Sequence, residues 1–378
     1  MVYSASSAES LLTAGDPAYY LKRYLLFGLL GLGILHLASR HGLKAIRAIT
    51  PVLLVGSFAL TVLVMLPGFG ASANGATRWF AAGPLQFQPS ELLKVSLILY
   101  AAQLLAARPS SLKTHGGIVK PLLLVVGAGC ALLLKQPDMG TAVVICLATG
   151  ALLVAAGTPV RHLATIAGVL LLLGAIVALA EPYRRARLTA FMNPWANPND
   201  SGFQSVQAMI AIGSGGPFGV GLGESVQKIF YLPEAHTDMI LAIIGEELGV
   251  IGISAVAALY GMIAYAGFRT AKLARDRYSK LLATGMTSLI LCQATLNLFA
   301  VVGLAPLTGV PLPLLSYGSS NLIVMLAGMG LLLNVAATGG RPLRAIGGGR
   351  ERDASRDRGR RHGRARGAGT GGRRRAAG

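Results

Sequence analysis

The sequence predicts an all-α polytopic membrane protein, and three observations support this fold class. Hydrophobic residues make up 53% of the 378-residue chain, charged residues make up only 13%, and the mean hydropathy is +0.60. A soluble domain carries about 25% charged residues. The apolar residues gather in long runs, and Lys and Arg gather in alternate connections between the runs. Each run is expected to be a helix, because open strands cannot cross lipid.

Nine runs are predicted to span the membrane. A span needs roughly 20 apolar residues, with a range of about 17–25. The predicted spans are 22–40, 46–66, 91–107, 118–135, 140–157, 162–180, 239–267, 281–303 and 319–338.

Basic residues predict the orientation of these spans, because cytoplasmic connections carry an excess of Lys and Arg. The connections on the predicted cytoplasmic side contain Arg40, Lys44, Arg47, Arg108, Lys113, Lys120, Arg161, Arg269, Lys272, Arg275, Arg277 and Lys280. The C-terminus is therefore expected in the cytoplasm, and the large loop 181–238 is expected outside. Nine spans then place the N-terminus outside.

The basic residues also divide the chain into a membrane domain, 1–340, and a basic tail, 341–378. The net charge is +19, and thirteen arginines lie between Arg341 and Arg375. The tail lacks apolar periodicity, so we expect it to be disordered. It is predicted to contact either anionic lipid or an acidic partner, and nucleic acid is not an expected partner.

Neither a disulfide framework nor a zinc site is expected. The three cysteines all lie inside apolar runs and do not show zinc-type spacing. They are Cys130, Cys146 and Cys292.

The outer loop 181–238 is far longer than a usual connection, and loops of this length are functional or disordered. Its aromatic residues and its glycine cluster, which begins at Gly213, favour an ordered loop with tight turns. Residues 205–212 are apolar enough for a short interfacial helix.

Asp238 ends this loop at the edge of the apolar run that begins at Met239. A charge at the edge of hydrocarbon is costly to keep without a use, so Asp238 is the first candidate catalytic residue. Glu234, His236 and Thr237 share the segment, and one group there could act as a base. The alternative is that Asp238 only caps the following helix.

Further polar motifs lie in the other predicted outer connections. Arg78 and Trp79 could bind a phosphate and a sugar or prenyl group, or could anchor the chain at the membrane interface. Glu91 and Lys94 are three residues apart and share a helix face, so they could bind an anion or simply neutralise each other. The remaining candidates are Gln136, Asp138, Lys228, Ser316, Ser319 and Ser320. Their convergence on one side favours a single extracytoplasmic site.

These motifs together resemble the FtsW/RodA/SpoVE (SEDS) family of bacterial cell-wall polymerases. The resemblance runs nearly end to end and is carried by Met1–Ser7, Gly75–Lys94, Gln136–Thr141, Arg187–Trp195, Gly213–Gly223, Ser225–Asp238, Gly245–Gly252 and Pro306–Ser320. The segment from Gly221 to Asp238 is most similar to the division branch, FtsW.

The resemblance implies a ten-helix fold with both termini in the cytoplasm. In the family, a stretch similar to Met1–Ser7 closes the first helix. We therefore expect that most of the first transmembrane helix is missing from this chain, which would account for the count of nine.

The resemblance also implies a function and a set of site residues. The family polymerises lipid II, a disaccharide-peptide on undecaprenyl pyrophosphate, beside a class B penicillin-binding protein and other divisome proteins. The implied catalytic aspartate is Asp238, the implied tryptophan is Trp79, and the implied Glu/Lys pair is Glu91 and Lys94. Arg78, Lys94 and Lys228 are candidates to offset the charge of the leaving group.

No cofactor is expected, with a divalent cation (Mg or Mn) as the alternative. The expected location is the cytoplasmic membrane, at the division septum. Two other functions stay open: a lipid II flippase, and a scaffold without enzymatic activity that recruits the penicillin-binding protein. A flippase often shows internal repeats, and the sequence shows none that is convincing.

Overall fold

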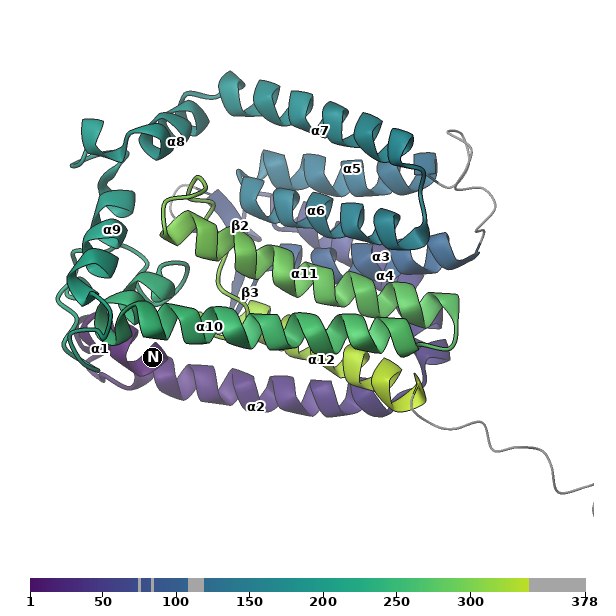
Figure 1. The fold of residues 1–378 in the computed structure, drawn as a ribbon, viewed down its shortest axis with the longest axis horizontal. Coiled ribbons are helices and arrows are strands. Elements are labelled where there is room, and N and C mark those ends of the chain that lie inside the picture. Colours follow the sequence, from purple (N-terminus) through teal and green to yellow (C-terminus); the bar gives the residue numbers. More distant parts are fainter. Residues whose placement is uncertain (74–75, 83–84, 108–118, 340–378) are drawn as a thin grey trace, which may run out of the picture. The chain divides into compact units, whose positions relative to one another are not determined.

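Figure 1 shows the computed structural model of the chain, which describes residues 1–73, 76–82, 85–107 and 119–339. The predicted basic tail, 341–378, lies outside the described residues. Long helices run alongside one another, and α1, α8 and α9 gather at one end of this bundle (Figure 1). The helices of the large loop and the N-terminal helix thus lie at the same end of the bundle.

The helices follow the apolar runs of the sequence. They are α1 (Val2–Ala14), α2 (Tyr19–Arg40), α3 (Leu43–Leu63), α4 (Pro89–Ala107), α5 (Val119–Lys135), α6 (Met139–Ala156), α7 (Val160–Ala180), α8 (Pro182–Met192), the short η2 (Pro194–Ala196), α9 (Phe203–Gly215), α10 (Ile240–Leu273), α11 (Arg277–Val301) and α12 (Ser319–Gly339).

Helices form most of each predicted span in the part of the chain that the structure describes. Among the described residues, eight helices are long and apolar enough to cross a membrane, and the chain is a multi-pass membrane protein. The remaining predicted span, 118–135, contains α5, which has 17 residues. That length is at the lower limit for crossing the hydrocarbon layer.

The connection between α3 and α4 differs from the predicted all-helical architecture. It contains three short antiparallel strands in the order β1 (Ala71–Ala73), β2 (Ala76–Ala82) and β3 (Leu85–Phe87). The local run Thr77-Arg78-Trp79-Phe80 is rich in residues that favour strands, and hairpin pairing satisfies the backbone groups of this connection. The sheet is small, so the fold remains almost entirely helical.

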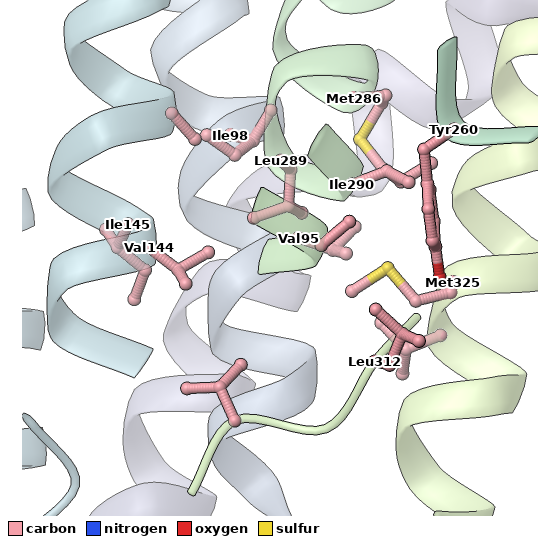
Figure 2. Packing of buried hydrophobic residues seen from close by; sticks show 14 of the residues in the cluster. Val95, Ile98, Val144, Ile145, Tyr260, Met286, Leu289, Ile290, Leu312 and Met325 are labelled. Atoms are coloured by element: carbon pink, nitrogen blue, oxygen red, sulfur yellow. The ribbon is translucent and has the colours of Figure 1, made fainter. Parts of the chain in front are cut away.

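The apolar core lies between α4, α6, α11 and α12. α4 packs against α3, α6 and α11, and Figure 2 shows Ile98 of α4 close to Leu289 of α11. Both side chains are fully buried. This core places the C-terminal end of α11 beside the start of α10, where the candidate site lies.

The large loop is ordered, as predicted, and it packs on a break in α10. The short helix predicted at 205–212 is part of α9, which packs against α10. At Gly249 the backbone of α10 leaves the helical region, with φ 66° and ψ −162°. The carbonyl of Glu246 accepts a hydrogen bond from the N–H of Val220 (2.9 Å) instead of from the next helical turn. Loop backbone therefore replaces the hydrogen bonds that the break removes.

Candidate active site

Asp238 lies in a small recess just before the first residue of α10. The recess is too narrow to admit a water molecule, and its walls are the C-terminal end of α11 and the segment that precedes α12. The residues that line the recess include Asp238, Asn297, Leu307, Thr308, Gly309 and Val310. The predicted catalytic carboxylate thus faces a cavity formed by elements that are far apart in sequence.

Asn297 holds the backbone of this recess in place. Its side-chain amide donates to the carbonyl of Asp238 at 2.7 Å and to the carbonyl of Val310 at 2.9 Å. The side chain is buried, so these hydrogen bonds are shielded from water. Asn297 of α11 therefore holds the backbone at Asp238 and the backbone at Val310 in fixed positions relative to each other.

The environment of Asp238 disfavours its charged form. Burial is the largest cause and the negative charge of Glu234 is the second, and together they raise the pKa of Asp238 to about 7. A backbone hydrogen bond, a hydrogen bond from Thr237 and, as the smallest effect, the positive charge of Arg187 act in the opposite direction. A carboxyl group with a pKa near 7 is suited to take a proton at neutral pH.

Thr237 links the two acids of this turn. Its hydroxyl lies 2.7 Å from Oε2 of Glu234 and 3.3 Å from Oδ1 of Asp238. The backbone of Glu234 has φ 57°, a left-handed conformation that closes the turn. A hydroxyl has one hydrogen to donate, so the two carboxylates compete for it.

His236 points away from the recess and joins three other elements. Its Nδ1 lies 3.1 Å from Oε2 of Glu9 in α1, and its ring packs on those of Tyr20 and Tyr317, with centroids 4.7 and 5.6 Å away. The contact with His236 holds the pKa of Glu9 below its usual value. These contacts fit a residue that positions the Asp238 turn.

Arg78 lies on β2 and donates to backbone carbonyls of the turn between α5 and α6. Its Nε donates to the carbonyl of Gln136 at 2.7 Å, and its Nη2 donates to the carbonyl of Pro137 at 2.6 Å. The next residue, Trp79, projects toward the opposite face of the strand. Arg78 therefore braces the sheet against the α5–α6 turn and keeps its positive charge.

The α5–α6 turn itself is held by hydrogen bonds. The side chain of Gln136 donates to the carbonyl of Thr61 at 2.9 Å, and the carboxylate of Asp138 accepts from the N–H of Thr141 at 3.2 Å. Asp138 is thus the N-cap of α6. A Cβ atom on Gly140 would clash with Thr308, so this turn touches the segment that lines the Asp238 recess.

Glu91 and Lys94 form a closed network inside the bundle. Nζ of Lys94 donates to Oε1 of Glu91 (3.0 Å) and to Oε1 of Gln293 (2.7 Å), and Asn321 donates to Oε2 of Glu91 (2.8 Å). Lys94 is 0% exposed and Glu91 is 2% exposed. The network joins α4, α11 and α12, and both charges are neutralised within it.

The predicted serines bind backbone atoms. The hydroxyl of Ser316 accepts from the N–H of Leu312 at 2.8 Å. The hydroxyls of Ser319 and Ser320 donate to the carbonyl of Gln86 at 3.0 and 3.2 Å. They hold the start of α12 against β3.

Lys228 forms hydrogen bonds beside the break in α10. Its Nζ donates to Oε1 of Glu247 at 3.0 Å, to the hydroxyl of Ser4 at 3.1 Å and to the carbonyl of Gly223. Lys228 is nearly buried, and Ser4 also donates to Glu247. These contacts tie α1 and the large loop to α10.

A metal site is not evident in the described part of the chain. Groups of three or more His, Cys, Asp or Glu side chains that could hold an ion are not found among the described residues.

Comparison with known proteins decides the family. The model of the FtsW/RodA/SpoVE family, described as "Cell cycle protein", matches residues 1–339. The chain belongs to the FtsW/RodA/SpoVE family. The "Probable peptidoglycan glycosyltransferase FtsW" of Geobacter sulfurreducens is 40% identical over 336 residues, which cover 89% of this chain and 90% of that protein.

Solved structures share the fold of the FtsW/RodA/SpoVE family. One, described as "Structural coordination of polymerization and crosslinking by a peptidoglycan synthase complex", has a TM-score of 0.74 and 30% identity, and the match covers 90% of this chain and 96% of that one. RodA of Thermus thermophilus has a TM-score of 0.63 and 29% identity, with 90% and 95% covered. The predicted resemblance and the predicted helical fold are confirmed.

Two residues of the candidate site, Asn297 and Arg187, were not predicted as site residues from the sequence. Asn297 is a polar residue inside an apolar helical run, and that signal could have identified it. Arg187 lies in a basic stretch of the large loop, and only the packing of α8 brings its charge near Asp238. The local sequence pattern around Arg187 does not show that it lies near Asp238.

Proposed function

We propose that the protein is a peptidoglycan glycosyltransferase that polymerises lipid II into glycan strands outside the bacterial cytoplasmic membrane. Membership of the FtsW/RodA/SpoVE family and the FtsW relative of Geobacter sulfurreducens support this chemistry. The observation that carries the proposal is the carboxylate of Asp238, which faces a recess and has a pKa raised to about 7.

Asp238 is the general base of the proposed reaction. It takes the proton from the 4-hydroxyl of the acceptor sugar as the hydroxyl oxygen attacks the anomeric carbon of the donor. The bond between that carbon and the pyrophosphate oxygen breaks, and undecaprenyl pyrophosphate leaves with the electron pair. Attack opposite the leaving group inverts the anomeric configuration.

The recess is too narrow to admit a water molecule, so the substrate lies outside it and meets the carboxylate of Asp238 at the opening of the recess. The prenyl chains belong in grooves between helices. An apolar groove of about 500 Å³ lies between α10 and α12 and reaches Pro313–Leu315, in the segment that also lines the recess.

The proposed topology places the recess on the outer side of the membrane and the C-terminus in the cytoplasm. The distribution of Lys and Arg between alternate connections supports it. Action at the division septum is proposed because the curated relative is an FtsW.

The proposed partner is a class B penicillin-binding protein, which cross-links the strands that this chain forms. The similarity to a peptidoglycan synthase complex supports such a partner. Other divisome proteins would join this complex, and the basic tail would contact anionic lipid or an acidic protein.

The test is strand formation from purified, labelled lipid II. The chain is reconstituted with a penicillin-binding partner that has no glycosyltransferase domain, and glycan length is measured on gels. We expect strands that depend on this chain. A complex that assembles without forming glycan would instead indicate a scaffold, and transport of labelled lipid II across proteoliposomes without glycan would indicate a flippase.

A further inference from the structure

A cation beside Asp238 is supplied by a residue outside the predicted set. Nη1 of Arg187 in α8 donates to the carbonyl of Leu307 at 3.1 Å. Leu307 and Asp238 line the same recess, and the positive charge of Arg187 lowers the pKa of Asp238. The guanidinium therefore lies directly behind a residue that lines the recess, within electrostatic reach of the carboxylate.

The three basic residues predicted to face the leaving group are used elsewhere in the fold. Lys94 is paired with Glu91 inside the bundle, and Lys228 is paired with Glu247 at the break in α10. Arg78 donates to two carbonyls of the α5–α6 turn. The positive charge that acts on Asp238 comes from Arg187.

We propose that Arg187 binds the pyrophosphate of the lipid donor next to Asp238; this inference rests on the proposed glycosyl transfer. As the bond between the anomeric carbon and the pyrophosphate oxygen breaks, the electron pair goes to that oxygen and the acceptor's proton goes to Asp238. A guanidinium matches two phosphate oxygens at once. It carries five N–H donors, so it can serve more than one partner.

The same charge keeps Asp238 able to accept a proton. A nearby cation favours the ionised form of a carboxyl group. Arg187 thus links the two halves of the reaction, because it stabilises both the base and the leaving group.

The test compares Arg187→Gln and Arg187→Lys with Arg185→Gln, a matched control. Arg185 is exposed and lies on the same helix. Glutamine keeps an N–H donor for the carbonyl of Leu307 but has no charge. We expect Arg187→Gln to lower kcat/KM for lipid II by about 10²–10³-fold, Arg187→Lys to be intermediate, and Arg185→Gln to match the parent.

The pH profile separates a charge effect from a structural one. Loss of the cation raises the pKa of Asp238, so the acidic limb of the rate profile should move to higher pH in Arg187→Gln. It should stay in place in Arg187→Lys and in Arg185→Gln. An unchanged acidic limb in a folded Arg187→Gln variant would overturn the inference.

Direct binding tests Arg187 independently of catalysis. Undecaprenyl pyrophosphate and undecaprenol are titrated against each variant in detergent by native mass spectrometry. The parent and Arg185→Gln should prefer the pyrophosphate, Arg187→Gln should lose that preference, and Arg187→Lys should keep part of it. Equal preference in all variants would contradict the proposal for Arg187, whereas a parent that binds the lipid but forms no glycan would contradict only the proposed function.

Discussion

The side-chain amide of Asn297 donates a 2.7 Å hydrogen bond to the backbone carbonyl of Asp238. This bond joins α11 to the residue that precedes α10, and a second bond from the same amide reaches Val310. The position of the candidate base therefore depends on one buried amide. The fold can place a carboxylate accurately in this way while the carboxylate itself remains available for chemistry.

The first prediction concerns Asn297→Ala. The change leaves two buried carbonyls without their donor, and each such loss costs about 1–3 kcal/mol. We expect a lower melting temperature in detergent and a slower rate of glycan formation. A variant with the parent's stability and rate would show that Asn297 does not position Asp238.

The second prediction concerns pH. The pKa of Asp238 is raised from 3.8 to about 7. The base acts when deprotonated, so the rate should rise as pH increases through about 7 and then level off. A profile that is flat between pH 5 and 9, measured at saturating lipid II, would contradict this assignment of the base.

The same shift predicts a gain in stability in Asp238→Asn. A carboxyl group whose pKa is raised on folding binds more protons in the folded chain, so its contribution favours folding at low pH and is lost as pH rises through about 7. Asparagine has no such charge to bury. Asp238→Asn should therefore melt higher than the parent at pH 8, with a smaller difference at pH 4.

The third prediction concerns the buried pair of Glu91 and Lys94. Removing one partner of a buried pair costs about 3–5 kcal/mol, because the other charge is left uncompensated. Lys94→Met should therefore be poorly folded. The double variant Glu91→Gln/Lys94→Met removes both charges and should recover much of the stability. Equal stability of the single and double variants would contradict the observed pairing.

The fourth prediction concerns the break in α10. Gly249 has φ 66°, and a Cβ atom there would lie 2.5 Å from the backbone of Pro217 and Gly219. Gly249→Ala should displace the large loop and lower the melting temperature. Gly261 is the matched control, because a Cβ atom there meets nothing within 4 Å. Gly261→Ala should be neutral or slightly stabilising, since glycine inside a helix costs roughly 0.5–1 kcal/mol relative to alanine.

The sequence predicted the helices well because spans are encoded locally. A run of apolar residues long enough to cross lipid has few alternatives to a helix. The strands at 71–87 were not predicted, because a short hairpin depends on pairing between segments that are not individually distinctive. The break at Gly249 was also missed, because glycine is frequent in transmembrane helices and does not by itself mark a break.

The candidate site was predicted only in part. The loop motif and the apolar run after it identified Asp238, but pattern alone could not show which polar groups the fold neutralises. Lys94 is bonded to Gln293, which lies 199 residues away in the chain. Arg187 acts on Asp238 only through the packing of α8 beside Leu307. Contacts of this kind arise from tertiary structure, and a single sequence does not record them.

The most direct measurement is the initial rate of glycan formation from lipid II by the Asp238→Asn variant in complex with its penicillin-binding partner. Asp200→Asn is the matched control, because Asp200 is an exposed aspartate of the same loop. We predict that Asp238→Asn lowers the rate by about 10²–10⁴-fold while the complex still assembles, and that Asp200→Asn keeps the parent's rate. A rate for Asp238→Asn equal to that of Asp200→Asn would contradict the account.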